Sequence, residues 1–198
     1  EGDAFIEGNT FEHFRKDQWN TGSGDANVIS AGGGHEFTVV RNTFYDVDHI
    51  AQVKDGSYMT LVNNTLVDCA ISALYFVRPG GTSDPGRGAY VEGNIFVNSP
   101  VVFDEVEPTT DLVAHRNIMP LAYHIYGTGN IAEDPRLVDP ANGDFSLMPG
   151  SPAIGTGPNG LDMGAIIPAG ASISGEPFAL TDETDATVSV SGPGITDY

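Results

Sequence analysis

An asparagine recurs at the same place in five segments of the sequence that align without gaps. The segments are "AFIEGNTF", "FTVVRNTF", "MTLVNNTL", "AYVEGNIF" and "LVAHRNIM", and their asparagines are Asn9, Asn42, Asn64, Asn94 and Asn117. The intervals between them are 33, 22, 30 and 23 residues. A period of this size is typical of solenoids, in which each repeat forms one coil. The two longer intervals contain Gly-rich stretches at residues 21–34 and 78–88, which we interpret as loops that project from turns.

The positions around each asparagine alternate in polarity. In every segment the residues five and three before the asparagine and two after it are apolar. The columns between them are mixed, and one such column holds Glu7, Val40, Val62, Glu92 and His115. A period of two indicates β-strands with one face in and one face out. We therefore predict an all-β parallel solenoid whose coils lie about 4.8 Å apart, with the asparagines at a corner as a hydrogen-bonded ladder.

Charge and composition exclude several classes of partner. The 198 residues carry 8 Lys and Arg against 27 Asp and Glu, which gives a formal net charge of −19. Nucleic acids and anionic membranes need a basic face, so neither is expected as a partner, whereas Ca²⁺ is compatible. The chain has no apolar run long enough to insert in a membrane. The single cysteine, Cys69, forms no internal disulfide.

The repeat resembles that of the right-handed parallel β-helix proteins, over about residues 1–167. The asparagine segments, the stretch "VKDGSYMTLVNNTLVDC" and a closing segment at residues 133–166 carry the resemblance. That segment, "EDPRLVDPANGDFSLMPGSPAIGTGPNGLDMGAI", is similar to the ending of many large secreted bacterial β-helix proteins. The resemblance implies a right-handed, pectate-lyase-like solenoid of about five to six coils, a closing segment that caps its open end, and a secreted or cell-surface location.

Residues 168–198 have a different character. They are rich in Thr, Ser and Asp and contain one alternating stretch, "ATVSVS". We interpret them as a linker and the start of a truncated Ig-like or strand-donating tail. The chain also begins in mid-pattern at "EGDAFIEGNTF", without a signal peptide, which suggests a mature fragment or an excised piece.

The stretch "YDVDHI" provides the candidate catalytic residues Tyr45, Asp48 and His49, with Lys54 shortly after. It resembles the Tyr-x-x-Asp-Pro-His stretch of β-helix uronan epimerases and alginate lyases, although His49 follows Asp48 directly. Such enzymes remove the proton next to a carboxylate and need a base, an acid and a cation. The alternative, which we prefer, is that "DVDH" is a polar turn between coils and that residues 54–56 form the next turn.

"DPANGD" spaces Asp139, Asn142 and Asp144 like part of a Ca²⁺ loop. No carboxylate follows at the distance a complete loop needs, and Asn-Gly is a strong turn signal. We prefer the turn, with a Ca²⁺ site as the alternative and no other cofactor expected.

Aromatic and basic residues outside the apolar columns are candidates for glycan binding. Trp19, Tyr58 and Tyr90 fall at outward or loop positions, and Arg78 and Arg87 lie in or beside the second Gly-rich stretch. Together they predict a face on which pyranose rings stack. The alternative is that these rings pack against neighbouring loops.

Two functions remain open. The first is a non-catalytic structural, adhesive or glycan-binding module of a secreted or cell-surface protein, which self-associates through the β-helix ends or the C-terminal strand. The second is a polysaccharide lyase or epimerase that acts on an acidic polysaccharide. The enzyme hypothesis requires Tyr45, His49 and Lys54 on one face beside an arginine. The module hypothesis predicts that these residues lie apart from one another.

Overall fold

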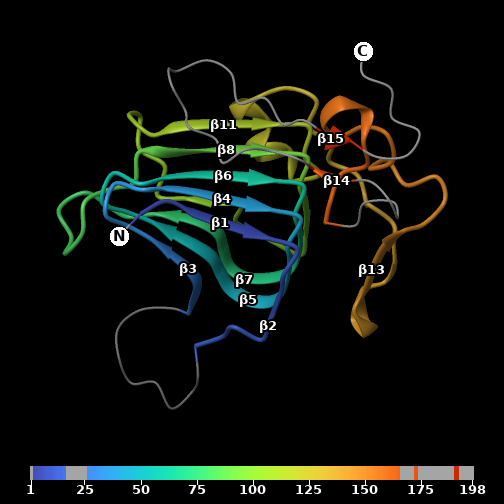
Figure 1. The fold of residues 1–198 in the computed structure, drawn as a ribbon, viewed down its shortest axis with the longest axis horizontal. Coiled ribbons are helices and arrows are strands. Elements are labelled where there is room, and N and C mark those ends of the chain that lie inside the picture. Colours follow the sequence, from blue (N-terminus) through green and yellow to red (C-terminus); the bar gives the residue numbers. More distant parts are fainter. Residues whose placement is uncertain (1, 17–25, 166–171, 174–189, 192–198) are drawn as a thin grey trace.

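The computed structural model describes residues 2–16, 26–165, 172–173 and 190–191. Stacked parallel strands dominate these residues, as Figure 1 shows. The predicted parallel solenoid architecture is confirmed at this level. Trp19 and most of the tail at 168–198 lie outside the described residues, where only two short strands of the tail, β14 (Ser172–Ile173) and β15 (Val190–Ser191), are placed as an antiparallel pair. Within the described part of the chain, no helix has the length and hydropathy needed to cross a membrane.

Sheet A contains the strand that precedes the asparagine in each of the five segments. All neighbouring strands are parallel, in the order β1-β4-β6-β8-β11. The strands are β1 (Ala4–Glu7), β4 (Glu36–Val40), β6 (Tyr58–Val62), β8 (Gly88–Glu92) and β11 (Asp111–His115). The predicted apolar column stacks in register, with Ile6 beside Val39, Val39 beside Leu61, and so on to Ala114.

Sheet B contains the strands that follow the asparagines. Its order is β10-β7-β5-β2, with β3 also paired to β5 and β9 to β7. The strands are β2 (Thr10–Glu12), β3 (Asn27–Ala31), β5 (Thr43–Val53), β7 (Thr65–Phe76), β9 (Ile95–Val97) and β10 (Phe103–Asp104). The two long strands, β5 and β7, bend around the core, and their pairing shifts register between Val47 and His49.

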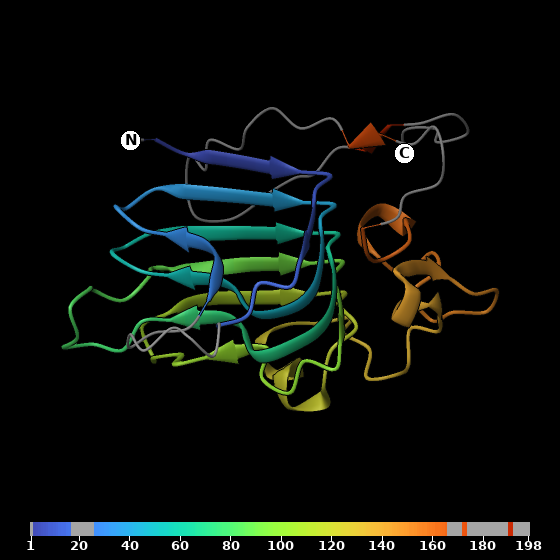
Figure 2. The ribbon, with the colours of Figure 1, turned by 90° about the horizontal axis from the view of Figure 1, so that it is seen from below.

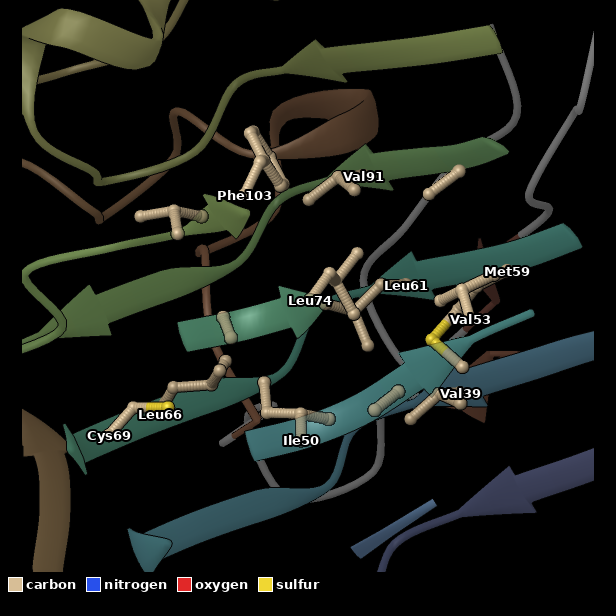
Figure 3. Packing of buried hydrophobic residues seen from close by; sticks show 14 of the residues in the cluster. Val39, Ile50, Val53, Met59, Leu61, Leu66, Cys69, Leu74, Val91 and Phe103 are labelled. Carbon is tan, nitrogen blue, oxygen red and sulfur yellow. The ribbon is translucent and has the colours of Figure 1, made fainter. Parts of the chain in front are cut away.

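The core fills the space between the two sheets. Phe44, Leu66 and Phe96 continue one predicted apolar column and are at most 5% exposed. Figure 3 shows how Val39, Leu61 and Val91 of sheet A lie close to residues of sheet B such as Leu74. Each coil thus buries its apolar face against the coils on either side, as a solenoid requires.

The asparagines form the predicted ladder, which the structure confirms. Four of them, Asn42, Asn64, Asn94 and Asn117, are fully buried. At each step the backbone N–H of one asparagine donates to the side-chain oxygen of the next, over 2.8 to 2.9 Å from Asn9 to Asn117. The side-chain NH₂ donates to carbonyl oxygens of its own coil and the preceding one, as Asn64 does to Val62 and Val39.

The ladder has a sixth rung that the repeat did not predict. The N–H of Asn117 donates to Asn130 Oδ1 over 3.0 Å, and Asn130 Nδ2 donates to the carbonyl of Ala114. The interval is only 13 residues. The signal was nevertheless present, because "GTGNI" repeats the pattern of "VEGNI" around Asn94.

Left-handed backbone conformations make the corners. The residue before each ladder asparagine has a φ between 48° and 67° from Gly8 to Arg116. A second column with positive φ lies four residues after the asparagines and consists of His13, Asp46, Asp68 and Asn98. Asn, Asp and Gly tolerate this region best, which explains most residues of these two columns, although Arg41, Arg116 and His13 adopt it as well.

The closing segment packs beside the stack. It contains β12 (Leu137–Asp139), η2 (Pro140–Asn142), β13 (Asp144–Leu147) and η3 (Pro158–Gly160). Its residues Ala153 and Met163 pack on Ile95 and Ile118 of the outer face. The end of the core is covered instead by the 3-10 helix η1 (Leu121–Tyr126), whose two tyrosines meet Phe103 edge-on. Figure 2 shows η1 below the last coil and the orange closing segment to one side. The closing segment was expected to cap the open end of the stack, but it covers one side of it instead.

Candidate functional site

Three of the four predicted catalytic residues lie on β5, but in different surroundings. The ring of Tyr45 packs on Phe145 of the closing segment, with ring centroids 5.7 Å apart, and faces the His13 ring at 5.8 Å. Asp48 and His49 are 6% and 3% exposed. The "DVDH" stretch is therefore a bend within β5 in which Asp46 is half-buried and the next three residues are buried, and our expectation of a polar turn between coils was wrong for it.

Asp48 binds backbone N–H groups on both sides of residues 17–25, and the Gly-rich stretch at 21–34 that we interpreted as a loop contains β3. Its Oδ2 accepts the backbone N–H of Lys16 at 2.7 Å and that of Ala26 at 3.5 Å. Its Oδ1 lies 3.4 Å from Arg15 Nη1. The carboxylate thus connects both sides of residues 17–25 to β5. Both of its oxygens are used in these structural contacts.

We expect Asp48→Asn to loosen this connection, because the amide keeps one oxygen for the two N–H groups but loses the negative charge and presents an NH₂ donor to the Arg15 guanidinium. Trypsin cleavage after Arg15 and Lys16 should become about tenfold faster through local opening. The matched control is Asp68→Asn, whose carboxylate accepts only the exposed Asn98 side chain among the bonds seen here. Equal cleavage rates in the two variants would show that Asp48 does not hold the loop.

His49 is bound to the neighbouring coil. Its Nδ1 lies 2.8 Å from Ser72 Oγ and 3.1 Å from Ser72 O, and its ring lies against Tyr75 at 5.7 Å. A histidine held this way on a buried strand is suited to linking coils. Nothing in these contacts brings it to Tyr45.

Lys54 lies beyond the end of β5, in a tight turn. Ser57 N–H donates to its carbonyl at 3.0 Å, and Asp55 and Gly56 have φ values of 53° and 74°. The turn expected at residues 54–56 is therefore confirmed. Lys54 pairs there with Pro85 of the second Gly-rich loop.

The structure gathers a different set of residues around Tyr45. His13 Nδ1 lies 2.7 Å from Asp46 Oδ2, and Arg15 Nε donates to Asp46 Oδ1 at 2.6 Å. The hydrogen bond from His13, and after it Arg15, holds the pKa of the Asp46 carboxyl below its ordinary value, against burial. The side chain of His13 is 65% exposed. Tyr45, His13, Asp46 and Arg15 thus form one accessible polar group, which we call the His13 cluster.

The predicted binding residues Tyr58, Arg87 and Tyr90 do come together on the outer face of sheet A. The Arg87 guanidinium carbon lies 4.6 Å from the centre of the Tyr58 ring, and Arg87 pairs with Glu36 at 2.5 Å. Tyr58 is only 7% exposed, and burial raises the pKa of its phenol. Because Arg87 covers this ring, Tyr58 is not an open platform for a sugar.

Tyr90 belongs to a partly buried polar group that the sequence did not indicate. Its hydroxyl donates to Glu92 Oε2 at 2.7 Å, and Arg116 forms an ion pair with the same carboxylate. Glu92 is 3% exposed, although it occupies an outward column. Burial, and then the Glu92 hydrogen bond, raises the pKa of Tyr90. His115, which we placed among outward residues, contacts the Tyr90 ring and accepts the Thr128 N–H at 2.9 Å.

Arg78 lies apart from these groups. It forms an exposed ion pair with Glu105. Trp19 belongs to the residues that the structure leaves undescribed. The expected sugar-stacking face therefore has only two of its three aromatic residues in described positions, and Tyr90 is the more accessible of them.

The candidate Ca²⁺ ligands lie in the hairpin between β12 and β13. Asn142 Nδ2 donates to Asp139 Oδ2 at 2.8 Å, and Asp144 Oδ1 accepts the N–H of Ser146 at 3.0 Å. Gly143 has a φ of 81°, as a turn of this kind needs. Nowhere in the described ranges do three or more His, Cys, Asp or Glu side chains gather as a metal site. The hydrogen bonds of Asp139, Asn142 and Asp144 are those of a turn, as we preferred.

A hollow of about 360 Å³ lies where the closing segment leaves the stack. It is lined by the apolar residues Phe96, Ile118 and Met119 and by the acidic residues Glu133 and Asp134. A second hollow of about 260 Å³ adjoins it along Val97 and Pro135. Both are open and lack a convergent set of charged groups.

Comparison with protein-family models, with curated proteins and with solved structures found no match for this chain.

Proposed function

We propose that the protein is a non-catalytic structural module of a secreted or cell-surface protein, built as a right-handed parallel β-helix of about five to six coils. The observation that carries this proposal is the separation of the predicted catalytic residues. Tyr45 contacts the closing segment, His49 contacts Ser72, and Lys54 lies in the turn that follows β5. An acid, a base and a cation that act on one substrate atom need a shared cleft.

The construction of the stack suits a rigid spacer or adhesive element. A hydrogen-bonded ladder, buried at its four central asparagines, joins its coils, and the closing segment is fixed to three of them. The acidic surface would keep such a module soluble and limit edge-to-edge aggregation. Glycan binding would involve Tyr90, and self-association would use the ends of the β-helix or the C-terminal strand.

The His13 cluster favours a second candidate function, a lyase or epimerase acting on an acidic polysaccharide. His13 is oriented by Asp46 and leaves Nε2 for a proton, Tyr45 is adjacent, and Arg15 carries positive charge. These are the kinds of group that proton abstraction next to a carboxylate requires. Arg15, however, forms ion pairs with Asp46 and Asp48, and these carboxylates weaken its attraction for an anionic substrate.

A reaction screen separates the two functions. The protein would be incubated with alginate, pectate, chondroitin and hyaluronan, with Ca²⁺ or with a chelator. Absorbance of unsaturated uronic acids would report lyase action, and proton NMR would report epimerisation. We expect no turnover. Turnover that is lost in His13→Ala but retained in His124→Ala, a histidine on η1, would overturn the structural proposal.

A further inference from the structure

The two most exposed large apolar side chains of the described residues lie on the short helix η1. Leu121 and Ile125 are 70% and 81% exposed, and no other large apolar residue in the described ranges exceeds 46%. A 3-10 helix has three residues per turn, so side chains at i and i+3 lie one above the other. Tyr123 and Tyr126 share the edge that packs on Phe103, with ring centroids 5.5 Å apart. Leu121 and Ile125 lie on the other two edges and face solvent.

The fold itself places η1 at this end of the stack. The chain reaches η1 shortly after β11, the last strand of sheet A, and then continues through Asn130 into the closing segment. Figure 2 shows η1 below the last coil, with the closing segment to one side. The outer edges of η1 are therefore part of the surface that this end of the stack presents.

The segment around η1 carries no formal charge. Residues 117–132 contain no Asp, Glu, Lys or Arg, although the chain has a net charge of −19. Two copies of such a chain repel each other, and this repulsion is weakest where neither surface is charged. A foreign partner is selected largely by complementary charges, which this segment does not offer. An uncharged apolar surface does match a copy of itself.

We propose that η1 is the contact surface between two copies of this chain, which meet end to end about a two-fold axis. The proposal rests on the proposed structural function and names the end of the β-helix that self-associates. Two-fold symmetry brings the same surface of both copies together, so each apolar side chain contributes twice. Leu121 and Ile125 of the two copies are then removed from water together, which is the driving force of the contact.

The contact is weak because η1 is small. A standard interface takes about 20 to 30 residues from each partner, whereas η1 has 6 residues. We therefore expect a dissociation constant of about 100 μM. Such an affinity is useful to a module of which many copies are held on one surface, since neighbouring copies then have a high effective concentration.

Sedimentation of the whole chain, from well below to well above that dissociation constant, tests the proposal. We expect a monomer–dimer equilibrium that Ile125→Asp weakens at least about tenfold, because the two-fold axis brings two charges into an apolar contact. The matched control is Ile154→Asp, which places the same charge on the closing segment at a residue that is 44% exposed. It should leave the equilibrium unchanged. Circular dichroism would check that both variants fold.

Salt provides a second measurement on the unchanged chain. Added salt screens the repulsion between two acidic chains, so it should strengthen a dimer held by apolar side chains. A dimer held by ion pairs at another surface would respond in the opposite way. A dimer that dissociates on addition of salt would therefore contradict the proposal.

A chain that stays monomeric, or a dimer that Ile125→Asp leaves intact, would overturn the proposal. Growth beyond the dimer would do so too, since a two-fold contact closes on itself. So would a monomer that floats with phosphatidylcholine vesicles through Ile125, because a neutral lipid surface would then be the occupant. The reaction screen is independent of these outcomes. A monomer that is inert toward polysaccharides keeps the structural function and loses this contact, whereas a dimer with turnover keeps the contact and loses that function.

Discussion

Replacing Asn64 with alanine should lower the free energy of unfolding by about 4 kcal/mol, the larger of two expected effects on stability. Asn64 is fully buried at the centre of the ladder. Its Oδ1 accepts the N–H of Asn42 at 2.8 Å, and its Nδ2 donates to the carbonyl of Val39 at 2.9 Å. Alanine leaves that N–H and that carbonyl buried without a partner, and each such group costs about 1 to 3 kcal/mol.

The measurement is urea unfolding followed by circular dichroism, with Asn9→Ala as the matched control. Asn9 contributes the same side chain to the same ladder, but it is exposed and water replaces its lost bonds. We expect its loss to cost less than about 1 kcal/mol. If both variants lost the same stability, burial of the ladder would not be the source of its strength.

Gly88→Ala should also be strongly destabilising, by about 3 kcal/mol. Gly88 begins β8 beside Asp111 of β11, and a β-carbon there would meet the backbone carbonyl of Asp111. The obstruction is backbone, so it cannot rotate away as the end of a flexible side chain would. The added methyl must therefore push the last strand of sheet A from its place.

Gly81→Ala is the control for this change, because it adds the same methyl group in an exposed loop. The nearest atom to its β-carbon is Arg78 O at 3.6 Å, an ordinary contact. We expect a change within about 0.5 kcal/mol. A loss below about 1 kcal/mol for Gly88→Ala, measured by the same unfolding curves, would mean that β8 and β11 have more room than their pairing indicates.

The stacking of the coils could be predicted because it depends on short-range alternation. Ile6, Val39 and Leu61 share a column since every inward residue must be apolar, and the asparagines between them mark the corner. Asn130 was missed because its coil is only 13 residues long. The column of His13, Asp46 and Asp68 was missed as well, since its residue types differ and only their left-handed backbone is shared.

The polar groups could not be predicted, because they join residues from different coils. His13 and Asp46 are 33 residues apart, and Glu92 meets Arg116 across 24. Alternation indicates that Glu92 points outward, but it does not indicate that its neighbours bury it. The same limit applies to Asp48, whose partners are Arg15 of the preceding coil and two backbone N–H groups that carry no sequence signal.

The closing segment also changes the connectivity of the stack. Asn63 Nδ2 donates to the carbonyl of Asp162, and the N–H of Ala165 donates to Thr65 Oγ1, across 99 and 100 residues of chain. The chain from Asn63 to Ala165 is therefore a loop closed by non-covalent bonds. A single cut near Gly81 would fall between these two contact points. The two fragments would remain connected both by the pairing of neighbouring coils and by the closing segment. The closing segment thus adds a second connection between parts of the chain that the pairing of neighbouring coils already holds together.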